Sequence, residues 1–254
     1  MSSFPVPGEG TFFCTQRYQA LDGGPHELCP HPTLDEDGDW TAELDRKRAE
    51  FPDARGVRPH TCINGHMISI EFKKRGFEWI SARDEPGRQG IVPYREAWGV
   101  WHVPIYYMDN MDFSFGDFWP EAPAAPFGRE LLEAATRQPG LYVFDFHPIH
   151  LMLNSTSAEE YFSRRDRFKA AEPLEEIRCE GYGASDYYAD LVSLMQEAGV
   201  ESVGISDALA AATRDEVPRN PETRIGAEGS APAGPPHARR GRGSPPTRRR
   251  SIPP

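Results

Sequence analysis

Residues 141–154 of this chain read LYVFDFHPIHLMLN. The first six are mostly aromatic and branched aliphatic residues, a composition typical of a buried β-strand. His147 follows directly, and Pro148 argues against the middle of a helix here. A histidine at the end of a strand suits a general acid or a metal ligand, because its side chain titrates near neutral pH. For His147 and His150 taken alone, structural hydrogen bonds to the loop backbone are the competing interpretation.

Other strands precede this one and alternate with helices. Residues 77–81 and 100–107 are rich in aromatic and β-branched residues, and two short apolar runs, 11–15 and 26–29, lie nearer the N-terminus. Helical spacing of apolar residues is found in 41–51, 64–75, 128–137, 158–168 and 185–198. Strands that alternate with helices of about ten residues favour βαβ units and a parallel sheet or barrel. The expected fold class is therefore α/β.

Polar side chains collect where the expected strands end. In α/β folds the functional site forms beyond the carboxyl ends of the strands. Four strands of this chain, one of them a short stub at Val57–Arg58, are accompanied by such residues, namely His31, then Arg58 and His60, then Asp109 and Asp112, and finally His147 and His150. We expect these side chains to converge on one site.

The residue types at these positions indicate a metal-dependent sugar site. Histidine nitrogen and carboxylate oxygen commonly bind zinc and leave one position open, so His31 and Asp35 are candidate metal ligands. A solvated acidic turn is the competing interpretation for the loop that contains Asp35. Arg58 can hold a carboxylate in place. Aromatic residues near Asp109, such as Trp101, can stack on sugar rings, although many of them are expected to belong to the core.

Charge divides the chain into two parts. The whole chain has a net charge of −11, and its segment 221–254, with seven Arg and two Glu, carries +5, which leaves −16 for residues 1–220. We expect one folded domain, 1–220, and a disordered Pro/Gly/Arg-rich tail, 221–254. An acidic body argues against a nucleic-acid partner. The arginines of the tail can contact nucleic acid or an anionic membrane, but an inert extension is the preferred interpretation.

Cysteine usage and hydropathy indicate a cytoplasmic protein. The four cysteines form no C-x-x-C pair, and three of them, Cys14, Cys29 and Cys62, lie among apolar neighbours, as suits reduced thiols. No stretch approaches the about 18 apolar residues of a membrane span. Residues 1–10 lack the basic and apolar regions of a signal peptide. The sequence sets no oligomeric state.

Five segments carry a family resemblance. TFFCT (11–15), HELCPHP (26–32), GVRPHT (56–61), WHVPIYYMD (101–109) and FHPIHLMLN (146–154) occur in the order found in polysaccharide deacetylases. Across residues 10–154 the chain resembles this NodB-homology family, and in particular its branch from bacterial surface-polysaccharide loci. FHPIHLMLN is the most specific of the five segments.

The resemblance implies a distorted (β/α) barrel of seven strands that removes N- or O-acetyl groups from a sugar or polysaccharide precursor. Family members use a divalent metal, usually zinc, held by one Asp and two His; a second Asp is the general base, and a His of the last barrel strand is the acid. By position, His31 corresponds to the first metal His, Arg58 to the family's R-x-P-Y arginine, and His147 to the acid. We expect substrate contacts from the following residues: His60, Trp101, Tyr107 and His150.

The chain also departs from the family pattern. The family's T-F-D-D motif lies on a strand before the one that matches TFF, and only ten residues precede TFF here. We therefore expect a barrel that is truncated at its N-terminus and lacks the metal Asp and the base Asp. Asp35 stands where the second metal His is expected, and Asp109 or Asp112 would have to accept the proton. The expectation is a metal-dependent deacetylase with little or no activity; a non-catalytic carbohydrate-binding or scaffolding protein is the alternative.

Overall fold

A computed structural model describes residues 4, 6–34, 38–109 and 129–214, which belong to one compact unit within 1–215. Asp35, Asp112 and the tail 221–254 lie outside the described residues, so the expectations for them stay predictions. The described strands are β1 (Thr11–Cys14), β2 (Glu27–Pro30), β3 (Gly56–Val57), β4 (Trp79–Ile80), β5 (Tyr94–Arg95), β6 (Trp101–His102), β7 (Tyr107–Met108) and β8 (Phe144–Asp145). The described α-helices are α1 (Trp40–Glu50), α2 (His66–Lys74), α4 (Arg129–Arg137), α5 (Pro148–Leu153), α6 (Ala158–Lys169), α7 (Leu174–Ile177), α8 (Ala184–Ala198) and α9 (Ile205–Ala212).

The strands form three small sheets. β1 pairs with β2, and β7 pairs with β8, both in parallel. The third sheet has the order β3-β4-β6-β5, in which only the β5–β6 pair is antiparallel. Backbone contacts join the sheets: Arg58 donates its N–H to the Pro30 carbonyl at 3.3 Å, and Asp84 and Ile105 form a parallel bridge. The mostly parallel pairing confirms the α/β class.

A closed barrel of seven strands is not formed by the described residues. Six of their eight strands are only two residues long. Proline offers no N–H to a ladder, and Pro30, Pro59 and Pro104 each lie at or beside the end of a described strand, which keeps the ladders short.

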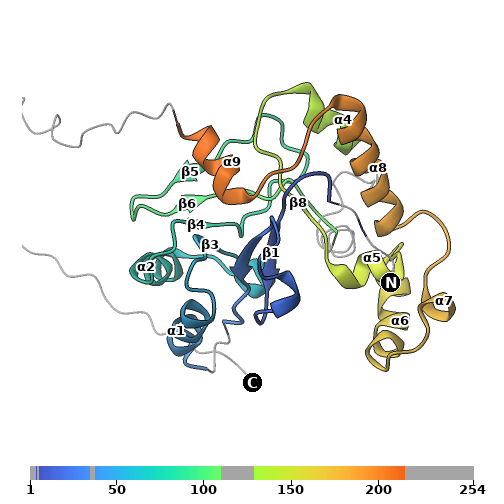
Figure 1. Cartoon of the computed structure of the whole chain (residues 1–254), viewed down its shortest axis with the longest axis horizontal. Coiled ribbons are helices and arrows are strands. Elements are labelled where there is room, and N and C mark those ends of the chain that lie inside the picture. The colour runs from blue at the N-terminus through green and yellow to red at the C-terminus, as the bar shows by residue number, and fades with distance from the viewer. Residues whose placement is uncertain (1–3, 5, 35–37, 110–128, 215–254) are drawn as a thin grey trace, which may run out of the picture. The chain divides into compact units, whose positions relative to one another are not determined.

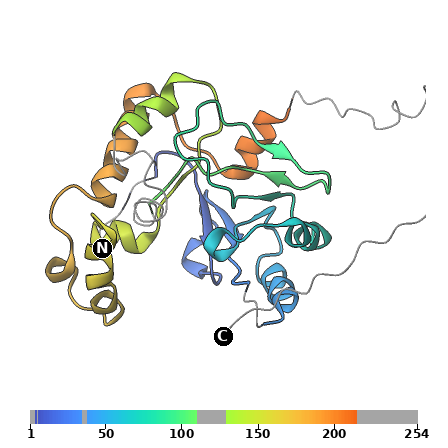
Figure 2. The same ribbon diagram turned by 180° about the vertical axis from the view of Figure 1, so that it is seen from behind.

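Helices cover the sheets and bury two larger apolar cores. Figures 1 and 2 show α1 and α2 beside the β3–β4–β6–β5 sheet, and α4 next to α8. The larger core contains Phe72, Phe77 and Trp79, each fully buried. A second core joins Tyr106 and Tyr187 and belongs to β7, α4 and α8. Five expected helices are present as α1, α2, α4, α6 and α8, each with bounds within a few residues of the prediction.

The start of α1 illustrates how the local sequence sets an element. Asp39 is the N-cap, and its Oδ1 accepts the backbone N–H groups of Thr41 and Ala42, both at 3.1 Å. This satisfies two donors that an uncapped helix would leave unpaired. Leu44, fully buried, then anchors the helix on the core. The cap fixes where the chain turns after the loop that follows His31.

Candidate active site

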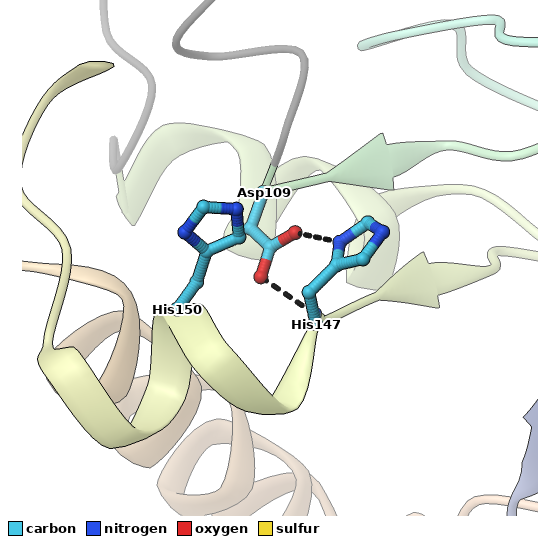
Figure 3. A group of neighbouring side chains, drawn as sticks. All are labelled: Asp109, His147 and His150. Carbon is cyan, nitrogen blue, oxygen red and sulfur yellow. Dashed lines mark hydrogen bonds and ion pairs between the residues drawn. The ribbon is translucent and has the colours of Figure 1, made fainter. Parts of the chain in front are cut away.

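An aspartate and a histidine meet where two neighbouring parallel strands end. β7 and β8 are in register with Met108 opposite Asp145, so the residues that follow both strands lie at one edge. The Asp109 carboxylate accepts the His147 backbone N–H at 2.7 Å and the His147 Nδ1 at 2.6 Å (Figure 3). Asp109 is fully buried, whereas 35% of the His147 side chain is exposed. The pair thus has a buried, fixed end and an accessible imidazole.

The pair binds its proton more tightly than either group would alone in water. Burial raises the pKa of Asp109 to about 6, although the hydrogen bond and the charge of His147 lower it. Burial lowers the pKa of His147, but the hydrogen bond that His147 donates to Asp109 and the charges of Asp109 and Asp145 outweigh burial, so the pKa is raised from 6.5. An imidazolium that a neighbouring carboxylate stabilises is a suitable general acid.

His150 lies on α5, one turn after His147, and is 2% exposed. Its Nδ1 is 3.1 Å from the Ser155 Oγ, and its ring packs on Tyr161 with the centroids 4.5 Å apart. Burial and the nearby charge of His147 lower the pKa of His150 to about 3. Asp109, His147 and His150 each offer a ligand atom within 4.8 Å of the others (Figure 3). One carboxylate and two imidazoles are donors that suit zinc.

α5 begins at Pro148, in keeping with the expectation that Pro148 does not lie in the middle of a helix. Pro148 is the first residue of α5, and His147 is its N-cap. Proline is favoured at the first helical position, because that residue's N–H has no partner within the helix. His150 therefore lies in the first turn of a helix that the sequence analysis did not predict.

Arg58, which follows β3, is buried and holds a carboxylate. Its Nη1 is 2.6 Å from Asp145 Oδ1. Nε donates to the Ser81 carbonyl at 2.9 Å, Nη2 donates to the Ser81 Oγ at 2.8 Å, and the guanidinium lies 4.1 Å from the centre of the Phe13 ring. Together these contacts fix the orientation of the Arg58 guanidinium group. Arg58 is thus paired with a carboxylate, the kind of partner that we expected for it, and this carboxylate is that of Asp145.

Two further histidines meet beside Arg58. His31 Nδ1 is 2.8 Å from the Arg58 carbonyl, and His31 Nε2 is 3.1 Å from His60 Nδ1. His31 is partly buried, and His60 is exposed. Burial, and after it the positive charges of His60 and Arg58, lower the pKa of His31 to about 4. The imidazole of His31 is therefore neutral at physiological pH.

Asp145 links these groups into one site. It contacts Arg58 directly, it precedes His147 by two residues, and its charge acts on His31 and on Asp109. Asp84 is half-buried, and burial raises its pKa to about 6. The charge of Arg58 lowers that pKa and the charge of Asp145 raises it. The Asp84 Oδ1 has no hydrogen-bond partner among the described residues. The structure thus brings His31, Arg58, Asp109 and His147 together.

Sequence reasoning did not select Asp145 or Asp84. The available signal for Asp145 was a charge in an otherwise apolar strand, LYVFDF. Asp84 offered no comparable signal.

The two aromatic residues expected to bind substrate have other surroundings. Tyr107 is 2% exposed, and its ring lies 4.7 Å from that of Tyr187 in the second core. Trp101 packs against the larger core, and Arg95 lies 5.9 Å from its ring. Tyr107 has almost no ring surface free for a sugar, whereas Trp101 is half-buried, and both roles stay predictions.

Comparison with known proteins gives a family and a fold. Residues 6–165 match the model of the WbmS-like polysaccharide deacetylases. A crystal structure from Bordetella bronchiseptica, of a candidate polysaccharide deacetylase involved in O-antigen biosynthesis, is similar over 72% of this chain and 77% of its own, with 21% identity and a TM-score of 0.60. A GH57-type branching enzyme from Pyrococcus horikoshii matches over 75% of this chain and 46% of its own, with 15% identity and a TM-score of 0.37. No curated protein matches this chain.

The family match covers more than half of the chain and includes His31, Arg58, Asp109 and His147. It confirms the family resemblance and supports a function of the carbohydrate deacetylase type. In the part of the chain that is described, no helix has the length and apolar character that a membrane crossing demands. On the family match, this chain belongs to the WbmS-like polysaccharide deacetylases.

Proposed function

We propose that this chain is a metal-dependent hydrolase that removes acetyl groups from a carbohydrate. The observation that carries the proposal is the Asp109–His147 pair at the ends of β7 and β8. The buried carboxylate fixes the imidazole, and the imidazole is partly open to solvent. This arrangement can deliver a proton to a bound molecule.

His147 acts as the general acid. Its Nδ1 is occupied by Asp109, so the proton leaves from Nε2 towards the departing sugar amine or hydroxyl. Asp109 fixes the tautomer and stabilises the imidazolium. Help of this kind is typically worth about 10²–10⁴ in rate.

Asp145 is the carboxylate that can accept a proton from water. Asp109 is unsuited to this role, because both of its oxygens accept hydrogen bonds from His147. Asp145 uses Oδ1 for Arg58, and its side chain keeps 18% of its surface exposed. Acetyl hydrolysis requires a base that takes a proton from water and an acid that gives a proton to the leaving group.

The metal ion of the family would find suitable donors among the described residues. Asp109, His147 and His150 form one set, and His31 with His60 forms another pair of nitrogens. A divalent ion would polarise the acetyl carbonyl and make water more acidic. In the Asp109 set, however, the 2.6 Å hydrogen bond to His147 joins atoms that would face the ion.

A finer fold proposal accompanies the functional one. We propose that the three sheets are parts of one distorted barrel. Three observations support this: the Asp84–Ile105 bridge, the bond from Arg58 to Pro30, and a parallel bridge between Gly8 and Ser202, far apart in the sequence. The cytoplasmic location stays a prediction.

The test is acetyl release from acetylated amino-sugar oligomers and from 4-nitrophenyl acetate, with zinc added. We expect His147→Ala to reduce kcat by about 10²–10⁴ and Asp109→Asn to reduce it by a smaller factor. His66→Ala is the matched control, since this exposed histidine contacts Trp98. Turnover that is equal in His147→Ala and wild type would refute the acid role.

A non-catalytic carbohydrate-binding protein is the second candidate function. It is favoured by the end of β1, where Cys14 and Thr15 stand and no carboxylate is present. Binding of the sugar oligomers in calorimetry, without acetyl release by the wild type, would establish this alternative.

A further inference from the structure

Asp84 lies at the carboxyl edge of the β3-β4-β6-β5 sheet, beside the residues of the candidate site. It follows the last residue of β4 by four positions and forms a parallel bridge with Ile105, which follows β6. The Glu85 N–H donates to the Ile105 carbonyl at 2.8 Å, and the Ile105 N–H donates to the Arg83 carbonyl at 2.7 Å. The backbone on both sides of Asp84 is therefore held in place, and its side chain has a fixed origin.

The carboxylate of Asp84 forms no hydrogen bond or ion pair with any residue in the described part of the chain. Its Oδ1 is enclosed by protein and has no partner there, whereas its Oδ2 is not enclosed. The residue as a whole is half-buried. One side of the carboxylate is thus withdrawn from water, and the other side is open to a molecule that enters the site.

The other two carboxylates of the site differ from Asp84 in this respect. Asp109 accepts two hydrogen bonds from His147, and Asp145 pairs with Arg58 at 2.6 Å. A charged acceptor that is partly withdrawn from water without a partner is unfavourable for the folded chain. A buried polar group of this kind calls for an explanation, and the binding of a ligand provides one.

We infer that the Asp84 carboxylate accepts a hydrogen bond from a ring hydroxyl of the sugar that the site binds, and thereby helps to determine which sugars fit. The inference rests on the proposed function and adds a specificity-determining residue to it. The charges that act on Asp84 are those of Arg58 and Asp145. Asp84 thus faces the part of the site next to Arg58, whereas His147 serves the atom that leaves. An ionised carboxylate can only accept, and sugar hydroxyls are donors.

The surroundings of Asp84 favour a strong hydrogen bond. Burial, and after it the charge of Asp84, raise the pKa of the Cys62 thiol to about 11, and Cys62 packs against Ile105 and Met108. Apolar and weakly polar groups therefore lie beside the carboxylate and partly exclude water from it. A charge-assisted hydrogen bond in such surroundings is stronger than one at an exposed carboxylate. Its loss should weaken the binding of the sugar by about 10–100-fold.

The test is calorimetric binding of a trimer of N-acetylglucosamine to the full chain at about pH 8, where the carboxylate is ionised, since its pKa is about 6. We expect the dissociation constant to rise about 10–100-fold in Asp84→Ala and in Asp84→Asn. Asp53→Asn is the matched control and should bind as the wild type does, because this exposed carboxylate lies before the amino end of β3.

Urea unfolding separates a binding role from a structural one. The carboxylate has no partner to lose among the described residues, so Asp84→Asn should unfold at the wild-type urea concentration or above it. Circular dichroism checks that each variant is folded. Wild-type affinity in Asp84→Ala, a large loss of stability in Asp84→Asn, or no binding of the trimer by the wild type would overturn the inference.

Deoxy analogues of the trimer, each lacking one kind of ring hydroxyl, identify the donor. We expect one analogue to bind the wild type about 10–100-fold more weakly than the parent trimer does. The same analogue and the parent should bind Asp84→Ala with similar affinities, because the acceptor is already absent. This comparison is a double-mutant cycle between one side chain and one hydroxyl. Equal affinities of all the analogues for the wild type would contradict the inference.

A failure of this inference can be told apart from a failure of the proposed function. Binding that depends on Asp84, without release of acetate, would refute the hydrolase and support the inference. Release of acetate by a chain whose Asp84→Ala variant binds the trimer as the wild type does would support the hydrolase and refute the inference.

Discussion

The buried ion pair of Arg58 with Asp145 should be far more costly to break than an exposed pair of the same type nearby. Side-chain exposures are 3% for Arg58 and 18% for Asp145. Removal of one partner of a buried pair typically costs about 3–5 kcal/mol, because the other charge is left unpaired. Arg58→Met also loses the two hydrogen bonds to Ser81 and the contact with the Phe13 ring. The partial exposure of Asp145 lowers the cost, so we expect about 3 kcal/mol.

Arg55 provides the matched control. Arg55 lies three residues before Arg58 and pairs with Glu78 at 2.7 Å, but the two side chains are 46% and 48% exposed. Pairs of this kind contribute about 0–1 kcal/mol. Urea unfolding followed by circular dichroism should therefore show a much larger loss in the free energy of unfolding for Arg58→Met than for Arg55→Met, with similar m-values. Equal losses would refute the reasoning. Adding Asp145→Asn to Arg58→Met should recover part of the loss, since it removes the unpaired charge.

Three further predictions address packing, a polar network and pH. A Cβ at Gly56 would overlap the buried Trp79 indole, so Gly56→Ala should lower the free energy of unfolding, measured in urea, by about 3 kcal/mol. Gly65 has open space around it, so the control Gly65→Ala should leave the free energy of unfolding nearly unchanged. Glu27→Ala removes the acceptor of Thr11 and Ser206 and should cost about 1–3 kcal/mol without loss of acetyl release; a selective loss of activity would contradict this. The folded pKa of His147 is raised, so its contribution to stability is present below the unfolded pKa of 6.5 and is lost as pH rises through the folded value. NMR titration should show that pKa above 6.5 and a lower value in Asp109→Asn.

The pattern of the sequence predicted the helices well and the sheets less well. α2, α4 and α8 each bury at least one large apolar residue on one face, and the helical spacing of such residues marked their positions. The β5–β6 hairpin was missed, because Tyr94–Arg95 is short and half exposed, and its return depends on Gly99 at φ 83°. Two-residue strands carry no periodicity to recognise.

The sequence could predict which site residues follow the ends of strands. It could not predict which side chains contact one another. His31, Arg58, Asp109 and His147 each follow an expected strand, and that rule selected them. The partner of Arg58 could not be derived, because Asp145 lies 87 residues later, inside the strand 141–146. His31 and His60 lie on loops that a backbone hydrogen bond joins, from the His60 N–H to the Pro32 carbonyl at 2.8 Å, and no local propensity indicates such a contact between loops.

The balance of charge in the site bears on the kind of sugar that it can accept. Three carboxylates, those of Asp84, Asp109 and Asp145, stand against two cationic groups, Arg58 and His147; burial is the main cause that raises the pKa values of Asp84 and Asp109, and the charge of Asp145 adds to it. The same excess keeps the pKa of His147 raised despite burial. A sugar that carries its own carboxylate would add a further negative charge to this site, at close range and partly out of water. We therefore expect calorimetry to show weaker binding of an acetylated uronic acid than of the neutral acetylated amino sugar. The difference should shrink in Asp145→Asn, and equal affinities in the wild type would show that the substrate lies away from these carboxylates.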